Sequence, residues 1–233
     1  MDTIPSSILP ILPRPSHTPA ISTARLLLCP FKADDFSVLR KLRTTLDVMR
    51  WTHQGCIDLT EHETRAWMDN FIYENDEQKR RNYNFVVWRR ESAENDTPDR
   101  YNFEGTEIEK LSFIGVLGVI SLAGLHGPEV GYMFLPEAWG KGYATEALNG
   151  FTTAWWELPL HKSTASNNSQ DQGKLFAVTS KSNTGSTRVL AKCGWSIIGE
   201  GTENIEDCQV EILKWILERP LCDADVDCQT SSS

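Results

Sequence analysis

EVGYMFLPEAWGKGYATEA, residues 129–147, predicts a strand, a glycine turn and the start of a helix in direct succession. The apolar run ends at Leu135, Pro136 stops the strand, and a helical apolar pattern begins after Gly142. Gly140 and Gly142 flank a single residue, so the backbone can turn sharply between the two elements. Because the backbone N–H groups of such a turn converge at the positive end of the helix dipole, the stretch predicts an anion site that suits a pyrophosphate.

The spacing of the small residues in this turn excludes two other nucleotide-binding motifs. No glycine lies five residues before Gly140, as a P-loop requires. Thr145 occupies the last glycine position of the dinucleotide fingerprint. One interpretation without a ligand stays open, since two glycines can also serve only to connect a strand tightly to a helix.

The flanking sequence predicts an α/β fold with a mixed sheet that is covered by helices. Strands are expected over residues 21–31, 84–88, 112–122, 128–135, 175–180, 195–200 and 208–217. Helices are expected from Asp34 or Asp35, from the capping box of Thr60 and Glu63, over residues 142–156, and from the N-cap Asn183. The apolar positions of the first two helices are Phe36, Leu39, Leu42 and Leu46, then Ala66, Trp67, Phe71 and Ile72. Those of the last two are Ala147, Leu148, Phe151 and Trp155, then Val189, Leu190 and Cys193, with Gly194 as terminator.

The composition indicates one domain and an acidic surface. The chain has 233 residues, 40% of them hydrophobic, which suffices for one sizeable core. The net charge of −9 argues against nucleic-acid and anionic-membrane partners, because both favour a basic face. No apolar run approaches the roughly 20 residues of a membrane span. A cationic acceptor such as an amine would suit this charge.

Four polar or proline-rich segments are expected to lie outside the folded core. Residues 1–20 read as a disordered leader on a cytoplasmic protein, because Asp2 stands where a signal peptide has basic charge. Residues 221–233 read as a disordered acidic tail, and polar insertions are expected near residues 91–110 and 161–174. The folded domain is therefore predicted to span residues 21–220.

Cysteine and histidine spacing predicts neither a disulfide framework nor a metal site. The six cysteines form no C-x-x-C pair and lack a secretory context, so free thiols are expected. The five histidines never pair at ligand spacing.

Three motifs together resemble the GNAT superfamily of acyl-CoA N-acyltransferases. The run Glu129 to Ala147 is similar to the acetyl-CoA-binding motif of that superfamily, and most similar to the branch of ribosomal-protein N-terminal acetyltransferases. Asn183-x-x-Ser186-x-x-Val189-Leu190-x-Lys192-x-Gly194-Trp195 resembles the second motif, and Thr23-x-Arg25-Leu26-x-Leu28 resembles the first strand. The resemblance covers roughly residues 21–217 and implies a strongly twisted central sheet.

The resemblance further implies an enzyme that moves the acetyl group of acetyl-CoA to a primary amine by direct attack in a ternary complex. The acceptor would be a protein N-terminus or a small molecule, no metal would take part, and the protein would be a monomer or a homodimer. Pantetheine would lie where the strand ending at Leu135 parts from the strand 175–180, and its amides would pair with backbone groups of Met133, Phe134 and Leu135. The other residues implied to bind the cofactor are Trp139, Gly140, Lys141, Gly142, Tyr143, Ala144, Thr145 and Asn183.

Acetyl transfer requires a group that takes the proton of the amine and a group that donates to the leaving thiolate. Glu129 matches a frequent base candidate of the branch, although a solvated carboxylate at a strand end is the alternative. Ser186 could donate to the leaving thiolate, although an early helical serine often bonds its own backbone. His53 and His126 are loop residues that could relay a proton, and the sequence does not choose between them.

Two positions depart from the family pattern. Trp139 stands where Gln or Arg is usual, which removes a side-chain contact to phosphate and leaves the backbone cradle. Leu190 stands where many members carry a tyrosine that protonates the leaving thiolate, so this acid must come from elsewhere or from water. A non-catalytic acyl-CoA-binding module is therefore the main alternative to an enzyme, and an interaction domain with acidic loops is a third.

Overall fold

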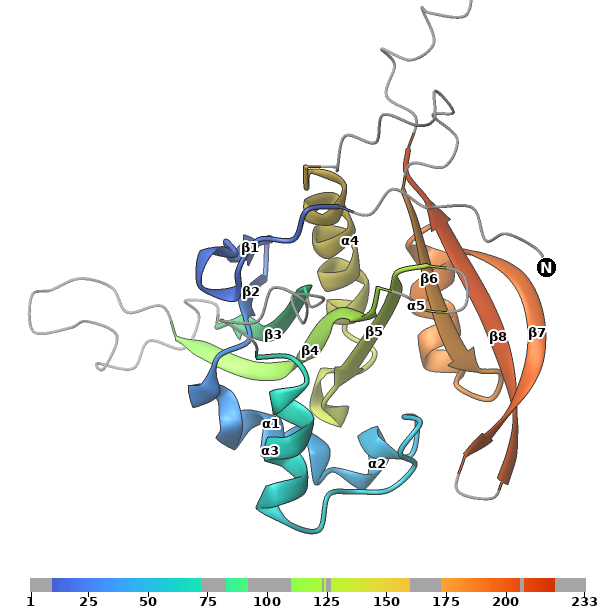
Figure 1. Ribbon diagram of the computed structural model, residues 1–233, viewed down its shortest axis with the longest axis horizontal. Coiled ribbons are helices and arrows are strands. Elements are labelled where there is room, and N and C mark those ends of the chain that lie inside the picture. The colour runs from blue at the N-terminus through green and yellow to red at the C-terminus, as the bar shows by residue number, and fades with distance from the viewer. Residues whose placement is uncertain are drawn as a thin grey trace, which may run out of the picture.

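The protein, described by a computed structural model over residues 10–72, 83–91, 110–122, 124, 127–159, 173–205 and 208–220, contains one eight-stranded sheet. The strand order is β1-β2-β3-β4-β5-β6-β8-β7, and every neighbouring pair is antiparallel except the parallel pair β5 and β6 (Figure 1). The strands are β1 (Ile21–Ser22), β2 (Leu26–Pro30), β3 (Tyr83–Arg90), β4 (Leu111–Ser121), β5 (Glu129–Phe134), β6 (Lys174–Ser180), β7 (Ser196–Ile205) and β8 (Cys208–Glu218). The predicted α/β fold with a mixed sheet is thereby confirmed.

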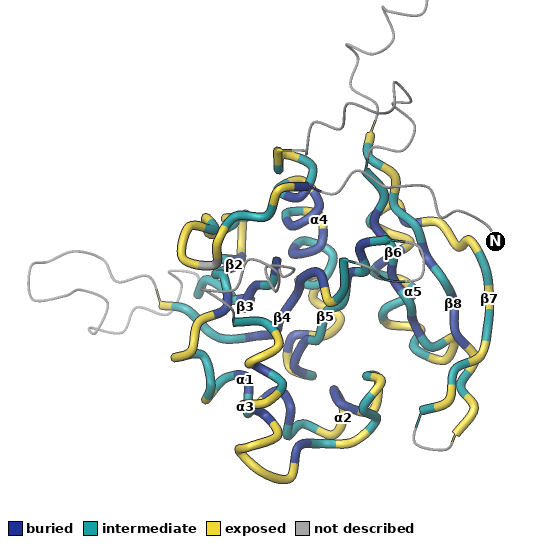
Figure 2. Tube along the Cα trace, viewed as in Figure 1, coloured by how far each residue is buried: buried dark blue, intermediate teal, exposed yellow. Residues whose placement is uncertain are grey.

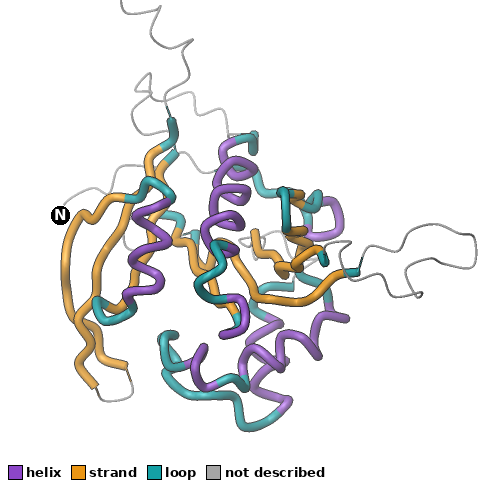
Figure 3. Tube along the Cα trace, turned by 180° about the vertical axis from the view of Figure 1, so that it is seen from behind, coloured by secondary structure: helices purple, strands orange, loops and turns teal. Residues whose placement is uncertain are grey.

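In the described part of the chain, five α-helices accompany this sheet. They are α1 (Phe36–Arg43), α2 (Leu46–Met49), α3 (Glu61–Asp69), α4 (Tyr143–Trp156) and α5 (Thr184–Lys192). Short 3-10 turns span Pro15–His17, Ala33–Asp35 and Pro136–Ala138. Seen from behind, α4 and α5 lie on one face of the sheet, while α1 and α3 lie in the lower part of the view (Figure 3).

Two hydrophobic clusters, one on each face of the sheet, follow from the two-residue period of the strands. Leu117 and Val119 of β4 belong to the cluster under α4 and α5, whereas Val116 belongs to the cluster under α1 and α3. In β5 the same alternation sends Phe134 to the first cluster and Leu135, just after the strand, to the second. The buried stretches of α4 and the central strands are seen together in Figure 2. The side chains of even-numbered β5 residues thus point to the face of α4 and α5, and those of odd-numbered residues point to the face of α1 and α3.

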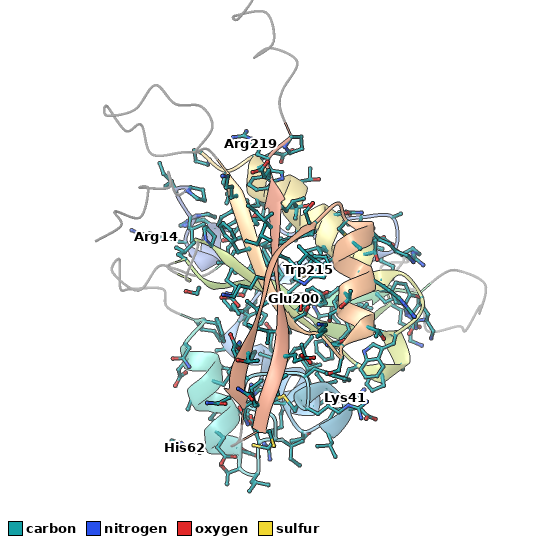
Figure 4. The ribbon with its side chains drawn as sticks, turned by 90° about the vertical axis from the view of Figure 1, so that its right-hand side faces the viewer. Arg14, Lys41, His62, Glu200, Trp215 and Arg219 are labelled. Atoms are coloured by element: carbon teal, nitrogen blue, oxygen red, sulfur yellow. The ribbon has the colours of Figure 1, made fainter. Side chains whose placement is uncertain are left out.

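The predicted helix-capping and core positions are largely confirmed. Thr60 Oγ1 accepts from the Glu63 N–H, and the Glu63 carboxylate accepts from the Thr60 N–H, which completes the capping box. In α4, the four apolar positions predicted to be buried are at most 3% exposed. Trp215 of β8 is also buried, and its indole donates to Thr179 Oγ1 at 2.9 Å (Figure 4).

The first predicted helix is shorter than its apolar stripe suggests. Leu46 belongs to the separate helix α2 and is 62% exposed, so its assignment to the stripe is wrong. The hydroxyls of Thr44 and Thr45 donate to the carbonyls of Arg40 and Lys41, at 2.8 and 2.7 Å. The Thr45 N–H donates to the Leu42 carbonyl at 3.2 Å, so the Lys41 carbonyl accepts from the Thr45 hydroxyl instead of from its N–H, and α1 ends here.

Other boundaries differ from the sequence-based prediction for equally local reasons. The predicted strand 21–31 is divided by a turn, in which the Thr23 N–H donates to the Leu26 carbonyl at 3.0 Å. In α3 the buried residues are Thr64 and Met68, whereas Ala66 is exposed. The helix ends at Asp69, before Phe71 and Ile72.

Residues 10–20 differ from the disordered leader that the sequence predicts over residues 1–20. The Ile11 N–H donates to the Pro159 carbonyl at 2.7 Å, and Leu12 packs against the core. Residues 1–9, the tail 221–233, and nearly all of the two expected insertions lie outside the described residues.

A buried ion pair ties α1 to the loop between α2 and α3. The Arg43 guanidinium donates to both carboxylate oxygens of Asp58, at 2.6 and 2.7 Å, and the two side chains are 5% and 0% exposed. Thr64 and Gln54 also donate to this carboxylate. Burial alone would raise the pKa of Asp58, but these hydrogen bonds outweigh it and hold the pKa below its usual value.

We expect Asp58→Asn to lower the free energy of unfolding by about 3–5 kcal/mol, because it leaves the Arg43 charge buried without its partner. Asp47→Asn is the matched control, since Asp47 pairs with Arg50 at 3.4 Å on the surface and should cost less than about 1 kcal/mol. Urea unfolding near neutral pH measures both. The lowered pKa of Asp58 means that the parent loses this stabilisation as the pH falls. The difference in the free energy of unfolding between the parent and Asp58→Asn should therefore become smaller in acid. Equal losses in the two variants at neutral pH would contradict the structural role.

Candidate functional site

The strands β5 and β6 are paired at one position only. Glu129 is aligned with Phe176, and the Phe176 N–H donates to the Pro128 carbonyl at 2.8 Å. Beyond this point β5 continues beside β4, while β6 continues beside β8 as far as Ser180 (Figure 1). The two strands therefore part, as the sequence resemblance implied, and β5 presents an edge toward β6.

The register of β5 decides which backbone groups this edge presents. The Leu135 N–H donates to the Ile114 carbonyl at 2.9 Å, so the backbone of Leu135, and by the two-residue period that of Met133, faces β4. Only Phe134 of the three expected residues turns its backbone toward the parting. Tyr132 has the same orientation and was not singled out from the sequence. The expectation for Met133 and Leu135 thus differs from the observed register.

Trp139 closes the end of this edge. Its indole Nε1 donates to the Phe134 carbonyl at 2.7 Å, although the residue is 43% exposed. The tryptophan that departs from the family pattern therefore links the glycine turn to the end of β5.

The glycine turn has the conformation that its sequence predicts. Gly140 and Gly142 have φ angles of 71° and 79°, and Gly142 is the N-cap of α4. Alternating left-handed and right-handed residues form a concave nest of N–H groups that suits an anion. Lys141 lies between the glycines, and Tyr143, Ala144 and Thr145 form the first turn of α4. The turn lies at the positive end of a 14-residue helix.

A carboxylate in the first turn of α4, that of Glu146, is connected to the glycine turn through Arg25. Glu146 Oε1 accepts from Thr23 Oγ1 at 2.7 Å and from the Arg25 N–H at 2.8 Å, while Oε2 accepts from Arg25 Nε at 2.7 Å. Arg25 Nη1 in turn donates to the Lys141 carbonyl at 3.1 Å. The Arg25 guanidinium also lies 4.6 Å from the centre of the Tyr143 ring. Arg25 and Glu146 belong to two of the sequence motifs, the runs 23–28 and 129–147, and their contact joins residues far apart in the chain.

Glu129 begins β5 at the point where the strands part. By the strand period its side chain shares the face of α1 and α3. Burial raises the pKa of this carboxyl above its usual value, with a lowering contribution from His53 and a raising one from Glu203. His53 Nδ1 and Glu203 Oε2 are 3.3 Å apart, which joins the loop after α2 to β7. Of the two loop histidines, His53 lies near Glu129, whereas His126 lies outside the described residues.

The second motif forms α5 beside the parting. Asn183 caps this helix, since its side chain accepts from the Ser186 N–H at 3.1 Å. Ser186 is partly exposed in the first turn of α5, and Leu190 is fully buried one turn later. The Tyr132 hydroxyl donates to the Ser186 carbonyl at 3.2 Å and so connects β5 with α5.

A surface groove of about 710 Å³ adjoins the glycine turn rather than the parting of the strands. It runs along the outer side of α4, and its lining includes Arg25, Gly142, Glu146 and Lys192. Among the described residues, no three His, Cys, Asp or Glu side chains are grouped to hold a metal ion. None of the helices within the described ranges is long and apolar enough to cross a membrane. Cys29, Cys56, Cys193 and Cys208 have free thiols, and the other two cysteines lie outside the described ranges.

Comparison with known proteins gives a family match and fold matches. The family model described as "Acetyltransferase (GNAT) domain" matches residues 25–196. A search of curated protein sequences gave no significant match.

Among solved structures, an acetyltransferase of the GNAT family from Bacillus anthracis has a TM-score of 0.58 at 20% identity, covering 85% of this chain and 98% of that one. Spermidine N-acetyltransferase from Vibrio cholerae, in complex with CoA and spermine, has a TM-score of 0.58 at 15% identity and coverages of 84% and 96%. An acetyltransferase from Salmonella typhimurium that modifies the N-terminal serine of ribosomal protein L7/L12 has a TM-score of 0.62 at 12% identity and coverages of 87% and 100%. At these identities the structures establish the fold.

We expect Glu146→Gln to loosen the glycine turn without unfolding the domain. Removing the charge weakens the contacts to Arg25 by about 1 kcal/mol, which corresponds to roughly fivefold faster amide hydrogen exchange in residues 140–144. Glu157→Gln, at the other end of α4, is the matched control and should leave exchange in this segment unchanged. Equal exchange in parent and Glu146→Gln would show that the Glu146 contacts do not order the turn.

Proposed function

Since this chain belongs to the acetyltransferase (GNAT) domain family, we propose that it transfers the acetyl group of acetyl-CoA to a primary amine by direct attack in a ternary complex. The observation that carries the proposal is the single aligned pair between β5 and β6, next to a glycine turn at the start of α4. An edge whose peptide groups are not paired with a neighbouring strand suits an extended pantetheine arm, and a nest at a helix N-terminus suits a pyrophosphate.

The cofactor would extend from the glycine turn toward Glu129. Its pyrophosphate would accept from amides of residues 140–144, and its pantetheine amides would pair with the backbone of Phe134 and Tyr132. Asn183 would act by capping α5 rather than by contacting the cofactor through its side-chain oxygen, which already accepts from Ser186. This arrangement would bring the thioester close to the end where the two strands meet.

The acceptor amine would approach from the face of α1 and α3. The amine nitrogen attacks the thioester carbonyl and forms the C–N bond, the C–S bond breaks, and its electron pair stays on sulfur. Glu129 would take the proton that the nitrogen loses, directly or through water, because its partly buried carboxylate lies on this face. Glu203 adds negative charge nearby, which suits a cationic amine. Products are the acetylated amine and CoA.

Acetyl-CoA should stabilise the fold if the cofactor site is correct. At 100 times the dissociation constant it would add about 2.7 kcal/mol to the free energy of unfolding, seen as a higher melting temperature. Gly142→Asp should abolish this ligand-induced shift, because it introduces a carboxylate beside the pyrophosphate at a φ of 79°. Gly199→Asp is the control, since a Cβ at Gly199 meets nothing within 4 Å and the shift should persist. A melting temperature of the parent that is insensitive to acetyl-CoA would refute the site.

A panel of amines separates enzyme from binding module. We expect CoA thiol release from acetyl-CoA with at least one of a serine-initiated peptide, spermidine and a lysine side chain, the first two suggested by the structural neighbours. Binding of acetyl-CoA without release on any amine would favour the non-catalytic module, for which the buried Leu190 is the specific observation. If the protein neither binds acetyl-CoA nor releases CoA thiol, an interaction domain is favoured.

The base role of Glu129 predicts a pH-dependent defect. Glu129→Gln should lower turnover more on a lysine-like amine, with a pKa of about 10.4, than on an α-amine of about 7.7–8.0, since the former needs more help to lose its proton. The ratio of parent to variant kcat/KM should fall toward one in acid, as Glu129 becomes protonated. Because burial raises the pKa of Glu129, this fall should begin at a higher pH than for an exposed glutamate.

Glu200→Gln is the matched control for Glu129→Gln. Glu200 lies on β7 and pairs with Lys181 at 2.8 Å, so its loss should leave the ratio flat (Figure 4). Equal rates of parent and Glu129→Gln between pH 6 and 9 would assign Glu129 a structural role only.

A further inference from the structure

We propose that the Tyr132 hydroxyl is the hydrogen-bond donor to the departing CoA thiolate, in place of the tyrosine that this chain lacks at position 190. The inference rests on the proposed acetyl transfer and adds a catalytic residue to it. The carrying observation is that the Tyr132 hydroxyl, from β5, donates to the Ser186 carbonyl of α5 at 3.2 Å.

This contact brings a hydroxyl to the helix that lacks one at Leu190. Ser186 and Leu190 are four residues apart and therefore lie on one face of α5. Leu190 is fully buried in the cluster under α4 and α5, and Tyr132 packs against the same cluster. A phenol supplied by the strand thus reaches the helix one turn before Leu190.

The side chains of Tyr132 and Glu129 lie on opposite faces of β5, near the point where β5 and β6 meet. They are three residues apart, so their side chains point to opposite faces and their Cα atoms are about 10 Å apart along the strand. The side of Tyr132 is that of α4 and α5, where the glycine turn would hold the cofactor phosphates. The side of Glu129 is that of α1 and α3, where the amine would enter. A thioester between them would have its carbonyl carbon open to the amine and its sulfur toward Tyr132.

The hydroxyl acts as a donor and keeps its proton. As the C–S bond breaks, the electron pair moves to sulfur, and the Tyr132 O–H turns from the Ser186 carbonyl to the thiolate. The proton lost by the nitrogen goes to Glu129 or water, and the thiolate is protonated from solvent, so the reaction balances without ionising the phenol. Burial raises the pKa of Tyr132 far above its usual value, which keeps the hydroxyl protonated throughout the working pH range.

The test uses the full chain, acetyl-CoA, and the best acceptor among the serine-initiated peptide, spermidine and the lysine side chain. Tyr132→Phe removes only the oxygen atom. We expect kcat to fall by about 10²–10³, which is what the loss of one preorganised donor costs, while the KM for acetyl-CoA changes little. Replacing Tyr132 by 3-fluorotyrosine keeps the donor and should restore kcat to near that of the parent. Tyr83→Phe is the matched control, because Tyr83, the first residue of β3, is 3% exposed in the main hydrophobic core, and the kcat of this variant should equal that of the parent.

Three results would overturn the assignment. Unchanged kcat in Tyr132→Phe would remove the hydroxyl from the reaction. A lower melting temperature and a higher KM for acetyl-CoA at unchanged kcat would make the contact to Ser186 structural. A loss of kcat in Ser186→Ala without a loss in Tyr132→Phe would assign the donor to Ser186. If the parent binds acetyl-CoA but releases no thiol with any amine, the proposed transfer itself fails, and Tyr132 has no thiolate to stabilise. This result differs from one in which the parent and the Tyr132→Phe variant are equally active, which would refute only the role of Tyr132.

Discussion

The parting of β5 from β6 is the constraint on which the candidate site depends. One aligned pair, Glu129 with Phe176, joins the antiparallel group β1 to β5 to the group β6, β8 and β7. The backbone edge of Phe134 and Tyr132 exists because β6, the neighbour of β5 on that side, pairs with β5 only at Glu129 and Phe176. The main core, which contains residues from α4, α5 and both strand groups, holds these groups together where backbone pairing stops.

Polar contacts then order the elements around this opening. The Arg43 and Asp58 pair is buried, so it fixes the loop between α2 and α3 that carries His53. The Glu146 contacts are more exposed and contribute less energy, yet they hold the carbonyl of Lys141 at the back of the turn. Trp139 binds the Phe134 carbonyl, which can still accept a second hydrogen bond through its other lone pair. Each contact limits how far a group at the opening can move.

Local sequence patterns predicted those features that depend on nearby residues. Gly140 and Gly142 required positive φ, Thr60 and Glu63 formed their capping box, and the apolar face of α4 is buried. Features that depend on strand register or on distant contacts were not accessible. The orientation of Met133 and Leu135 follows from the hydrogen bond to Ile114, which no pattern within β5 encodes. The pairs His53 with Glu203 and Tyr132 with Ser186 join segments whose proximity only the fold creates. The end of α1 at Thr44 and Thr45 was a readable local signal, since consecutive threonines compete with helical hydrogen bonds.

The position of the pantetheine arm in a crystal structure of the acetyl-CoA complex tests the central claim most directly. The account predicts an arm that runs between β5 and β6, with its amides bonded to the backbone of Phe134 or Tyr132 and the pyrophosphate on the amides of residues 140–144. A cofactor bound elsewhere, or β6 paired with β5 along the whole strand in the complex, would contradict it.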